Sequence, residues 1–593
     1  MDQHSYPGQA APAGSFPTDP SGLPEATRPA LLELADGDDL HLRIGPVAKR
    51  LGDTTVRMLG YNGSIPGPTL KVRQGSEVIV HVTNEGDLEA TVHWHGLRLE
   101  NKYDGVPHET QTPIPVGGSF TYRIRFPDPG LYWYHPHIRE DYTQEMGLYG
   151  NIVVVPADPG YWAPANRDVL LTLDDLLLED GKIAPFSPVE TTYTAMGRFG
   201  NVLLVSGEPD LSLTAAAGEV VRLWLTNTAN TRVFNVALPG ARMKLVGGDS
   251  GRVEHEEFVS QVLLAPSERA VVDVLFDRPG QLELEHRTPD RAYRLAAITV
   301  TEQQATPPLA GQFEVLREAP ELAAERQALG AWLAAPPDKT LALIAEMDDI
   351  AAPAQGEGLV VYACPMHPEV TSDEPGRCPE CGMKLLATAV ATGYACPMHP
   401  EVTSDQPGRC PKCGMKLLVT ALATQPAGRE PPTAPHSHDS HGHHGEGHSH
   451  GDAGGIEWED DMVAVNRLTT PANMRWKLVD RTSGAANAAI DWRFTAGDRV
   501  KIALVNEMDS DHPMHHPFHL HGAGRFLVLA RDGVPEPNLV WKDTVLVRTG
   551  QTVDILFDVT NPGLWMAHCH IAEHMQSGMM FSFIVARGEE AAR

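Results

Sequence analysis

The sequence lacks any run of eighteen or more apolar residues, the length that a membrane-spanning helix requires. It is also poor in basic residues, with 47 Lys and Arg against 77 Asp and Glu, a formal net charge of −30 at pH 7. So acidic a surface repels phosphate backbones and attracts cations. We therefore expect no membrane span, no nucleic-acid partner and an affinity for metal ions, although the charge could equally serve solubility alone.

The beginning of the sequence lacks the basic and apolar segments of a signal peptide. Residues 1–37 are rich in Pro, Gly, Ala and Ser, a composition that predicts a flexible leader. The compartment stays undetermined: the protein is cytoplasmic if the sequence is as written, and periplasmic or extracellular if an export signal was removed.

Cysteine is scarce and unevenly placed. Six of the 7 cysteines fall between Cys364 and Cys413, and the last is Cys569. This distribution is not a disulfide framework for so long a chain, and short Cys spacings beside His indicate metal binding.

The chain is too long for one core. Short runs that alternate apolar and polar residues, such as EVIVHVTN (77–84) and SFTYRIRF (119–126), predict strands of β-sandwiches. The same texture recurs later, so the fold class is predicted to be all-β with three sandwich domains. We expect domains at 38–157 and 158–303, a linker at 304–338 whose residues 309–335 are either helical or linker-like, and a third domain composed of 339–350 and 456–590.

An insertion of different composition divides the third domain. It contains two nearly identical copies of one unit, YACPMHPEVTSDEPGRCPECGMKLL (362–386) and YACPMHPEVTSDQPGRCPKCGMKLL (394–418). Such strict repetition indicates duplication. We place the repeats at 360–388 and 392–420 and predict a disordered His-rich linker at 421–455.

Each repeat carries a C-x2-H…C-x2-C pattern, the spacing of a tetrahedral zinc-ribbon site. The candidate ligands are Cys364, His367, Cys378 and Cys381 in the first repeat, and Cys396, His399, Cys410 and Cys413 in the second. Four neighbouring methionines are soft donors that would favour Cu(I): Met366, Met383, Met398 and Met415. The sequence leaves both zinc and Cu(I) as candidates for the bound metal. A purely structural zinc site is the alternative to a role in the transport of metal ions.

Four short motifs each contain an H-x-H pair: HWHG (93–96), HPH (135–137), HPFHLHG (516–522) and HCHIAEH (568–574). Residues i and i+2 of a strand face the same side, about 6.5–7 Å apart. The four pairs can therefore converge eight imidazoles on one place between two sandwiches. Imidazole suits copper, and eight rings exceed the needs of any single ion, so several ions are implied.

Cys569 stands between two of these histidines, His568 and His570. Strand alternation directs its sulfur away from the two flanking rings, so this segment would connect two metal centres covalently. A thiolate with two His and a long axial Met is the ligand set of blue electron-transfer copper, and His516, His574 and Met579 are available to complete it.

These motifs resemble those of the multicopper oxidase (laccase-like) family in kind and order, over about residues 40–303 and 339–586. The resemblance implies cupredoxin-like Greek-key sandwiches that hold four copper ions: one type 1, one type 2 and a type 3 pair. It assigns Cys569, His516, His574 and axial Met579 to type 1, His93 and His519 to type 2, and His95, His135, His137, His521, His568 and His570 to type 3. His512 and His515 are expected as surface groups near the type 1 site, with a role at that site as the alternative.

The resemblance also implies a reaction, the one-electron oxidation of a small substrate coupled to four-electron reduction of O2 to water. Glu573 and Asp104 match positions that supply protons in related oxidases, with a structural carboxylate as the alternative for each. The repeats resemble heavy-metal-binding domains and lie where copper-efflux oxidases carry a Met-rich insertion. The substrates expected are phenols and aromatic amines, Cu(I), or both. A copper storage or carrier protein is the alternative function, and a monomer is expected.

Overall fold

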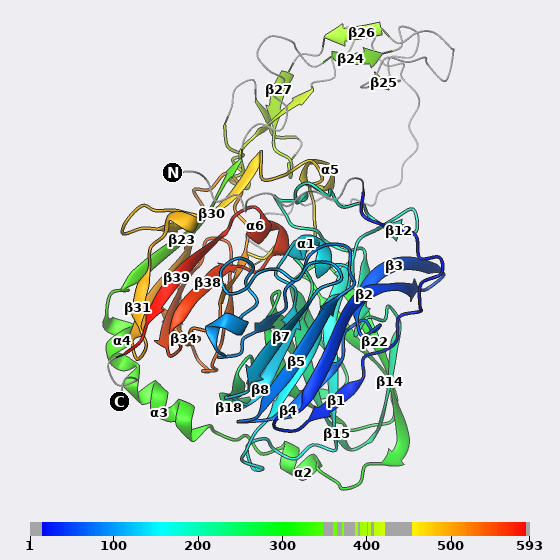
Figure 1. The fold of residues 1–593 in the computed structure, drawn as a ribbon, viewed down its shortest axis with the longest axis vertical. Helices are drawn as coiled ribbons and strands as arrows, with labels where there is room; N and C mark the ends of the chain where they lie inside the picture. Colours follow the sequence, from blue (N-terminus) through cyan, green and yellow to red (C-terminus); the bar gives the residue numbers. More distant parts are fainter. Residues whose placement is uncertain are drawn as a thin grey trace, which may run out of the picture.

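The computed structural model describes residues 15–347, 360–363, 371–372, 386–389, 392–399, 401–404, 408–421 and 454–588. These residues form three two-sheet β-sandwiches joined by short helices, with a small module above the third sandwich (Figure 1). Within the described part, no helix is long and apolar enough to cross a membrane. The predicted ligands of the first repeat, the first fourteen residues of the leader and the His tract all lie outside the described residues.

The first sandwich pairs a five-stranded with a four-stranded sheet. In sheet order these are β1 (Leu31–Leu34), β4 (Thr69–Arg73), β9 (Gly150–Val155), β8 (Gly130–His135) and β6 (His93–His95), then β3 (Thr54–Tyr61), β2 (Asp39–Leu51), β5 (Glu77–Asn84) and β7 (Ser119–Arg125). The residues of β5 alternate between buried and half-buried, as its sequence predicts. A 3-10 turn, η1 (Asn101–Tyr103), and a short helix, α1 (Glu140–Thr143), extend from this sandwich toward the third one.

The second sandwich has a six-stranded and a five-stranded sheet. In order they are β13 (Val202–Val205), β10 (Arg167–Leu176), β15 (Glu219–Asn227), β20 (Arg269–Phe276), β17 (Arg242–Gly248) and β18 (Gly251–Val259), then β14 (Leu211–Ala217), β22 (Ala292–Gln304), β21 (Gly280–Arg287), β16 (Phe234–Ala237) and β19 (Gln261–Leu264). The strands β11 (Leu178–Glu179) and β12 (Lys182–Ile183) form a separate ribbon, and β12 contacts β3 of the first sandwich.

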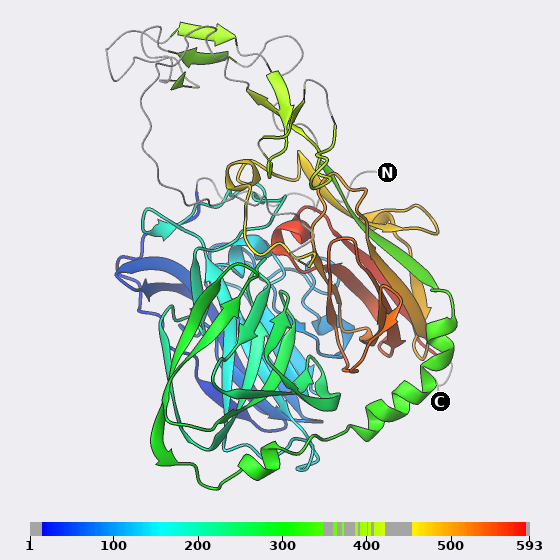
Figure 2. The same ribbon diagram turned by 180° about the vertical axis from the view of Figure 1, so that it is seen from behind.

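Three short helices follow the second sandwich and lead to the third along the outside of the molecule (Figures 1 and 2). They are α2 (Ala310–Phe313), α3 (Pro320–Ala328) and α4 (Gly330–Ala334). Leu322 and Leu329 of this connection pack against Leu527 and Leu529 of the third sandwich. The connection is therefore fastened by apolar burial.

The third sandwich repeats the six-plus-five arrangement. In order its strands are β30 (Met474–Asp480), β23 (Lys339–Met347), β32 (Arg499–Asn506), β37 (Thr552–Val559), β34 (Gly524–Arg531) and β35 (Val534–Pro535), then β31 (Arg493–Thr495), β39 (Met580–Ala586), β38 (Gly563–Cys569), β33 (His516–Leu520) and β36 (Thr544–Val547). Strand β23, which precedes the insertion, lies between β30 and β32, which follow it. The shorter elements α5 (Val463–Asn466), η2 (Asn487–Ala489) and α6 (Ala572–Gln576) complete this part.

The two repeats fold alike where they are described. Strand β24 (Val360–Ala363) lies between β25 (Thr371–Ser372) and β26 (Leu386–Ala389), and β27 (Thr392–Ala395) lies between β28 (Thr403–Ser404) and β29 (Leu418–Ala421). The registers correspond, since Tyr362 pairs with Ser372 and Tyr394 with Ser404. The sequence duplication is thus also a structural one, and the repeats rise beyond the ends of β23 and β30 (Figure 2).

Candidate metal centre

Eight imidazoles gather between the first and third sandwiches. Antiparallel pairing sets His93 of β6 opposite His135 of β8, and His519 of β33 opposite His568 of β38. Across the domains, the ring centroids of His93 and His521 lie 4.0 Å apart, and those of His95 and His519 lie 3.8 Å apart. All eight rings are at most 4% exposed. The H-x-H pairs of the sequence therefore meet in one buried place.

Most of these rings have one nitrogen held by an oxygen acceptor. His93 Nδ1 lies 2.7 Å from the Asp104 carbonyl, and His135 Nδ1 lies 2.8 Å from the Pro136 carbonyl. Asp543 holds two further rings: its Oδ1 lies 3.0 Å from His95 Nε2, and its carbonyl lies 2.9 Å from His519 Nδ1. The other nitrogen of each of these four rings is buried and has no hydrogen-bond partner among the described residues. Buried polar atoms are rarely left unpaired. A ring fixed at one nitrogen and open at the other is the usual state of a metal ligand, so this pocket fits metal ions.

The protonation state of the rings fits the same role. Burial lowers the pKa of His95, His135, His137, His519, His521 and His570 well below the ordinary histidine value. It lowers the pKa of His568 to about 4. These seven rings are therefore neutral, and neutral imidazole is the form that ligates a metal.

Side chains around the cluster fix the orientation of the rings. Asp104 Oδ2 accepts a hydrogen bond from His521 Nδ1 at 2.8 Å, while the carbonyl of the same residue holds His93. Asp543 holds His95 and His519 and is itself paired with the fully buried Arg269. The sequence did not predict these contacts of Asp543 and Arg269, because both residues lie outside the motifs and only the fold brings them to the rings.

Gly96, the last residue of HWHG, is required by this close packing. Its backbone has φ +83°, a conformation that favours glycine, and a Cβ atom there would lie 2.4 Å from Asp543 Oδ2. The glycine thus lets β6 and its histidines approach the carboxylate that orients them.

A second group of donors lies on the other side of β38. Cys569 Sγ is 3.5 Å from His516 Nδ1 and 3.8 Å from His574 Nδ1, and the two nitrogens are 3.3 Å apart. All three residues are fully buried. Met579 is also buried, and its carbonyl accepts a hydrogen bond from the Cys569 amide, so it lies next to this group. The donor set matches the His2Cys trigonal site with a weak axial Met that holds blue copper.

Cys569 and its neighbours face opposite sides, as strand alternation predicts. Its sulfur contacts His516 and His574, while His568 Nε2 lies 3.0 Å from His521 Nε2 in the cluster of eight. Two donor groups are thus joined through one residue of backbone. On the outer side, Trp476 stacks on the His574 ring at 4.1 Å and meets the His516 ring edge-on at 4.7 Å.

Two carboxylates from short helices approach these groups. Glu573 of α6 is 1% exposed, and one of its oxygens has no partner among the described residues, while the other accepts from Thr231 at 3.2 Å. Burial raises the pKa of Glu573 to about 8. Glu140 of α1, which the sequence reasoning missed although it follows HPH by three residues, lies 3.2 Å from His137 Nδ1. Helices α1 and α6 lie side by side between the sandwiches (Figure 1).

The expectation that His512 and His515 are surface groups is wrong. His512 is 1% exposed and His515 is fully buried. The second repeat covers His512, since Met415 Sδ lies 3.1 Å from its Nδ1. The chain that re-enters the third domain covers His515, whose Nδ1 accepts a hydrogen bond from the Glu457 amide at 3.1 Å.

The predicted ligands of the second repeat form a third donor group. Cys396 Sγ lies 3.4 Å from Cys413 Sγ and 3.7 Å from His399 Nδ1, and Cys410 Sγ lies 3.5 Å from the same nitrogen. A tetrahedron with metal–sulfur bonds of about 2.3 Å has edges of about 3.8 Å, so the spacing suits one tetrahedral ion. A hydrogen bond with Cys413 is the main cause that lowers the pKa of Cys396 to about 5, which favours the ligating thiolate.

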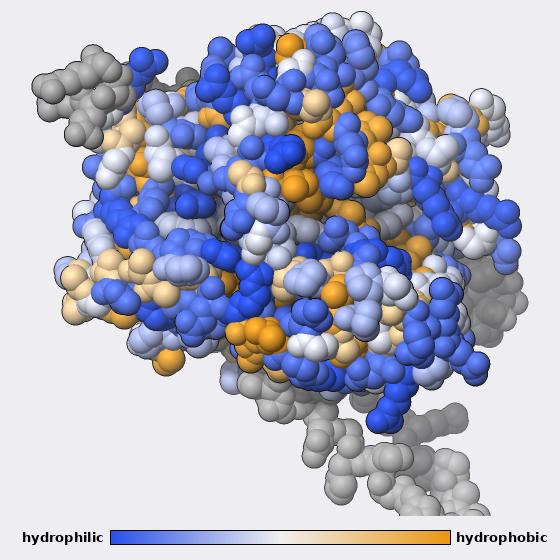
Figure 3. Space-filling view, turned by 90° about the horizontal axis from the view of Figure 1, so that it is seen from below, coloured by the Kyte–Doolittle hydropathy of each residue, from blue (hydrophilic) through white to orange (hydrophobic). Residues whose placement is uncertain are grey.

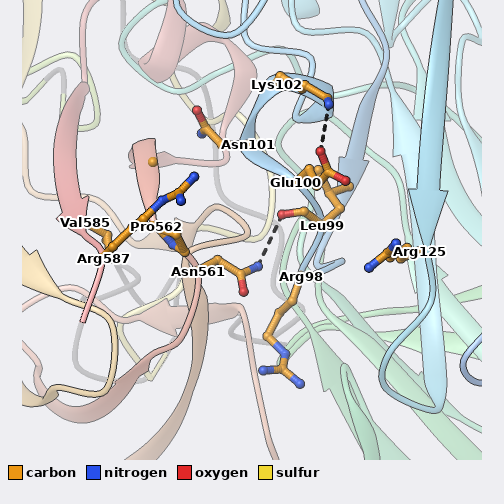
Figure 4. Close-up of a pocket in the computed structure, with 11 residues that line it drawn as sticks. Arg98, Leu99, Glu100, Asn101, Lys102, Arg125, Asn561, Pro562, Val585 and Arg587 are labelled. Carbon is orange, nitrogen blue, oxygen red and sulfur yellow. Dashed lines mark hydrogen bonds and ion pairs between the residues drawn. The ribbon is translucent and has the colours of Figure 1, made fainter. Parts of the chain in front are cut away.

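A cavity of about 670 Å³ opens elsewhere, where the first and third sandwiches meet (Figure 4). Arg98, Lys102 and Arg587 line it, together with Glu100, which is paired with Lys102. As far as the described residues define this cavity, none of the predicted copper ligands lines it. On the face seen from below, hydrophobic residues occur mainly in small groups within a hydrophilic surface (Figure 3). The eight imidazoles and the Cys569, His516 and His574 group are buried and lie apart from this cavity.

Comparison with known proteins agrees with this geometry. Multicopper oxidase family models match residues 46–159 and 460–589, and the heavy metal binding domain model matches residues 361–388 and 394–418. Multicopper oxidase MmcO of Mycobacterium tuberculosis is 27% identical over 559 residues, which cover 90% of this chain and 84% of that protein. Laccase-15 of Oryza sativa subsp. japonica is 26% identical over 564 residues, covering 89% of this chain and 87% of that protein.

The fold is similar to that of a multi-copper oxidase from Pseudomonas thermotolerans, with a TM-score of 0.58 and 22% identity over 94% of this chain and 100% of that one. This likeness confirms the all-β, cupredoxin-like fold class. The family binds copper, and the histidine and cysteine groups described above suit that metal. The first and third sandwiches thus match multicopper oxidase domains, and two heavy-metal-binding repeats are inserted in the third.

Proposed function

We propose that this protein couples the one-electron oxidation of a small reducing substrate to the four-electron reduction of O2 to water. The observation that carries the proposal is the position of Cys569, which links the His516–His574 group to the cluster of eight imidazoles through one stretch of backbone. Four electrons and four protons convert one O2 into two waters, so four substrate molecules are oxidised per cycle.

The proposed ligand assignment follows the two donor groups. Cys569, His516, His574 and Met579 would hold a type 1 copper. His93 and His519 would hold type 2 copper, and His95, His135, His137, His521, His568 and His570 would hold the type 3 pair. Copper supplies the one-electron redox chemistry when bound. The protein supplies neutral, pre-oriented rings, excludes water from both groups, and connects them covalently.

Within this proposal, electrons enter near His516 and His574. The path from Cys569 to His568 or His570 crosses only the bonds of adjacent residues. Trp476 covers the two outer rings and fixes their planes, since its indole nitrogen donates to the Thr194 carbonyl at 2.7 Å. Asp104 and Asp543 keep the inner rings in the tautomer that leaves one nitrogen open.

We propose that Glu573 and Asp104 supply protons for O2 reduction, because both are buried carboxylates beside the donor groups. Glu573→Gln preserves the shape and the Thr231 contact while removing the acid. We expect it to lower kcat by about 10²-fold with little change in KM, since general acids contribute on that order. Steady-state O2 consumption checks this, with the copper content measured in parallel. An unchanged kcat would remove Glu573 from the proton supply.

A second candidate concerns the substrate, and the second repeat supports it. The Cys-rich module is hydrogen-bonded to the loop that precedes His516: the Lys416 amide donates to the Asp511 carbonyl at 3.0 Å, and the Arg409 guanidinium pairs with the Asp511 carboxylate at 3.2 Å. A soft-metal module beside the electron-entry group favours Cu(I) as a substrate. Phenols and aromatic amines, the substrates of laccases, remain the general alternative. Storage or carriage of copper without oxidation is not favoured, because the relatives are named as oxidases and laccases.

Deletion of residues 351–455 separates these substrates. We expect the deletion to lower kcat/KM for Cu(I) by about 10-fold or more, because a tethered donor raises the local concentration of its cargo. Oxidation of a dimethoxyphenol should persist. O2 consumption by the copper-loaded proteins with each substrate is the measurement. If both rates survive the deletion, the repeats are accessory and the protein acts as a laccase.

A further inference from the structure

The second repeat touches the third sandwich through a pair of soft donor atoms. Met415 Sδ lies 3.1 Å from His512 Nδ1, and the two residues are 2% and 1% exposed. Thioether sulfur and imidazole nitrogen are both ligands that monovalent copper accepts. No residue of the type 1 or trinuclear assignment takes part in this contact.

This pair lies between two of the donor groups already described. On one side, the Cys410 amide donates to the Met415 carbonyl at 2.7 Å, so Met415 is fastened to a ligand of the Cys–His group. On the other side, the His512 ring lies 5.8 Å from the Trp476 ring, which stacks on His574 at 4.1 Å. A continuous series of packed side chains therefore leads from the repeat to the electron-entry group.

The second repeat docks on a surface of the third sandwich, here called the seat, that includes Met347, Ser510 and Asp511. Most of the docking contacts are hydrogen bonds to backbone carbonyls and an ion pair. Lys416 Nζ donates to the Met347 carbonyl at 2.7 Å, and Arg409 donates to the Ser510 carbonyl and pairs with Asp511. Leu417 and Leu418 pack into the core of the third sandwich. These contacts position the repeat without the Met415 sulfur, so docking by itself does not require a thioether facing an imidazole.

We infer that Met415 and His512 together form a substrate site for a monovalent soft metal ion, Cu(I), at the junction of the second repeat and the third sandwich. The inference rests on the proposed oxidation of Cu(I). Because both donors are almost fully buried, the ion reaches them from the Cys396, His399, Cys410 and Cys413 group and not from open solvent. Each Cu(I) loses one electron there and leaves as Cu(II). Four such electrons, with four protons, reduce one O2 to two waters.

Silver(I) tests the site in the full-length, copper-loaded protein, because it shares the ligand preferences of Cu(I) and is not oxidised under these conditions. The Cys–His groups bind Ag(I) as well, so the number of equivalents that each variant binds is compared with the number that the wild type binds. We expect one further equivalent of Ag(I) to bind and to shift the type 1 absorption band, since His512 packs on the tryptophan that covers His574. Met415→Leu and His512→Gln should each abolish that equivalent and its spectral shift.

The variants also carry a kinetic prediction. Met415→Leu conserves volume, an exchange that cores tolerate, and should lower the ratio of kcat/KM for Cu(I) to kcat/KM for a dimethoxyphenol at least tenfold. Met508→Leu is the matched control, the same exchange at a half-exposed methionine just before the seat, and should leave the Ag(I) titration and this ratio unchanged. Limited proteolysis of the insertion shows whether each variant keeps the repeat docked.

The outcomes distinguish a failure of the Met415–His512 site from a failure of the proposed oxidation of Cu(I). If Ag(I) leaves the type 1 band of the wild type unchanged, or binds Met415→Leu as it binds the wild type, the Met415–His512 contact is a docking contact and the inference is overturned. If Cu(I) is oxidised and Met415→Leu is as fast as the wild type, the site fails while the proposed function stands. If Ag(I) binds as expected and no form oxidises Cu(I), the metal site stands and its role as a substrate site fails.

Discussion

Cys569→Ser is expected to abolish both the blue absorption and the oxidase activity, with every substrate. The change replaces sulfur by oxygen in a fully buried place where Sγ faces two imidazole nitrogens at 3.5 and 3.8 Å. A hydroxyl at this position cannot supply the thiolate on which blue copper depends. The copper content should fall from four ions to three, because the donor atoms of the eight-imidazole cluster are untouched. Absorption spectra, metal analysis and O2 consumption measure the three effects.

Cys396→Ser is the matched control for this prediction. It removes a thiol of similar burial from the second repeat, outside the Cys569, His516 and His574 group, and should keep the blue absorption. A Cys569→Ser protein that stays blue would show that the chromophore belongs to another cysteine, and the assignment of His516 and His574 would fall with it.

Arg269→Met is expected to destabilise the protein by about 3–5 kcal/mol, the cost of removing one partner of a buried ion pair. The Arg269 guanidinium is fully buried, is paired with Asp543, and also donates to the Leu131 and Ser267 carbonyls. Its loss leaves the Asp543 carboxylate buried without its cation. Since Asp543 orients His95 and His519, the variant should also retain less type 2 and type 3 copper. Denaturant unfolding of the copper-free protein gives the first effect, and metal analysis gives the second.

Arg493→Met provides the comparison. Arg493 and its partner Asp491 are 65% and 67% exposed, and exposed pairs are worth at most about 1 kcal/mol. This variant should unfold and bind copper as the wild type does. Equal stabilities for Arg269→Met and Arg493→Met would contradict the structural role given to the buried guanidinium.

Much of the fold could be predicted because alternation is a local property. The alternation of apolar and polar residues in the β5 segment predicts a strand with one buried face. In each H-x-H pair, the spacing of two residues predicts that both histidines lie on the same face of their strand. The opposed orientation of Cys569 follows from the same rule. These features need no knowledge of distant parts of the chain.

The surroundings of the metal groups could not be predicted in the same way. Asp543 meets His95 across a gap of several hundred residues, and neither belongs to a pattern that contains the other. The burial of His512 depends on where the second repeat docks, and no periodicity encodes a docking position. Long-range contacts of this kind are decided by tertiary packing.

The pairing of β23 with β30 has a consequence for the history and the engineering of this chain. Met347 and Met474 face each other in register, so everything between them is a single excursion from one edge of an intact sheet. The entropic cost of such a loop grows slowly, by about 0.6 kcal/mol for each doubling of its length. The chain can therefore carry insertions of very different length at this position while the pairing of the sheet is unchanged. Different domains can therefore be inserted at this position. Exchanging the repeats for another metal-specific domain should change which metal ion is delivered to the enzyme, without altering the sandwiches that carry the predicted copper ligands.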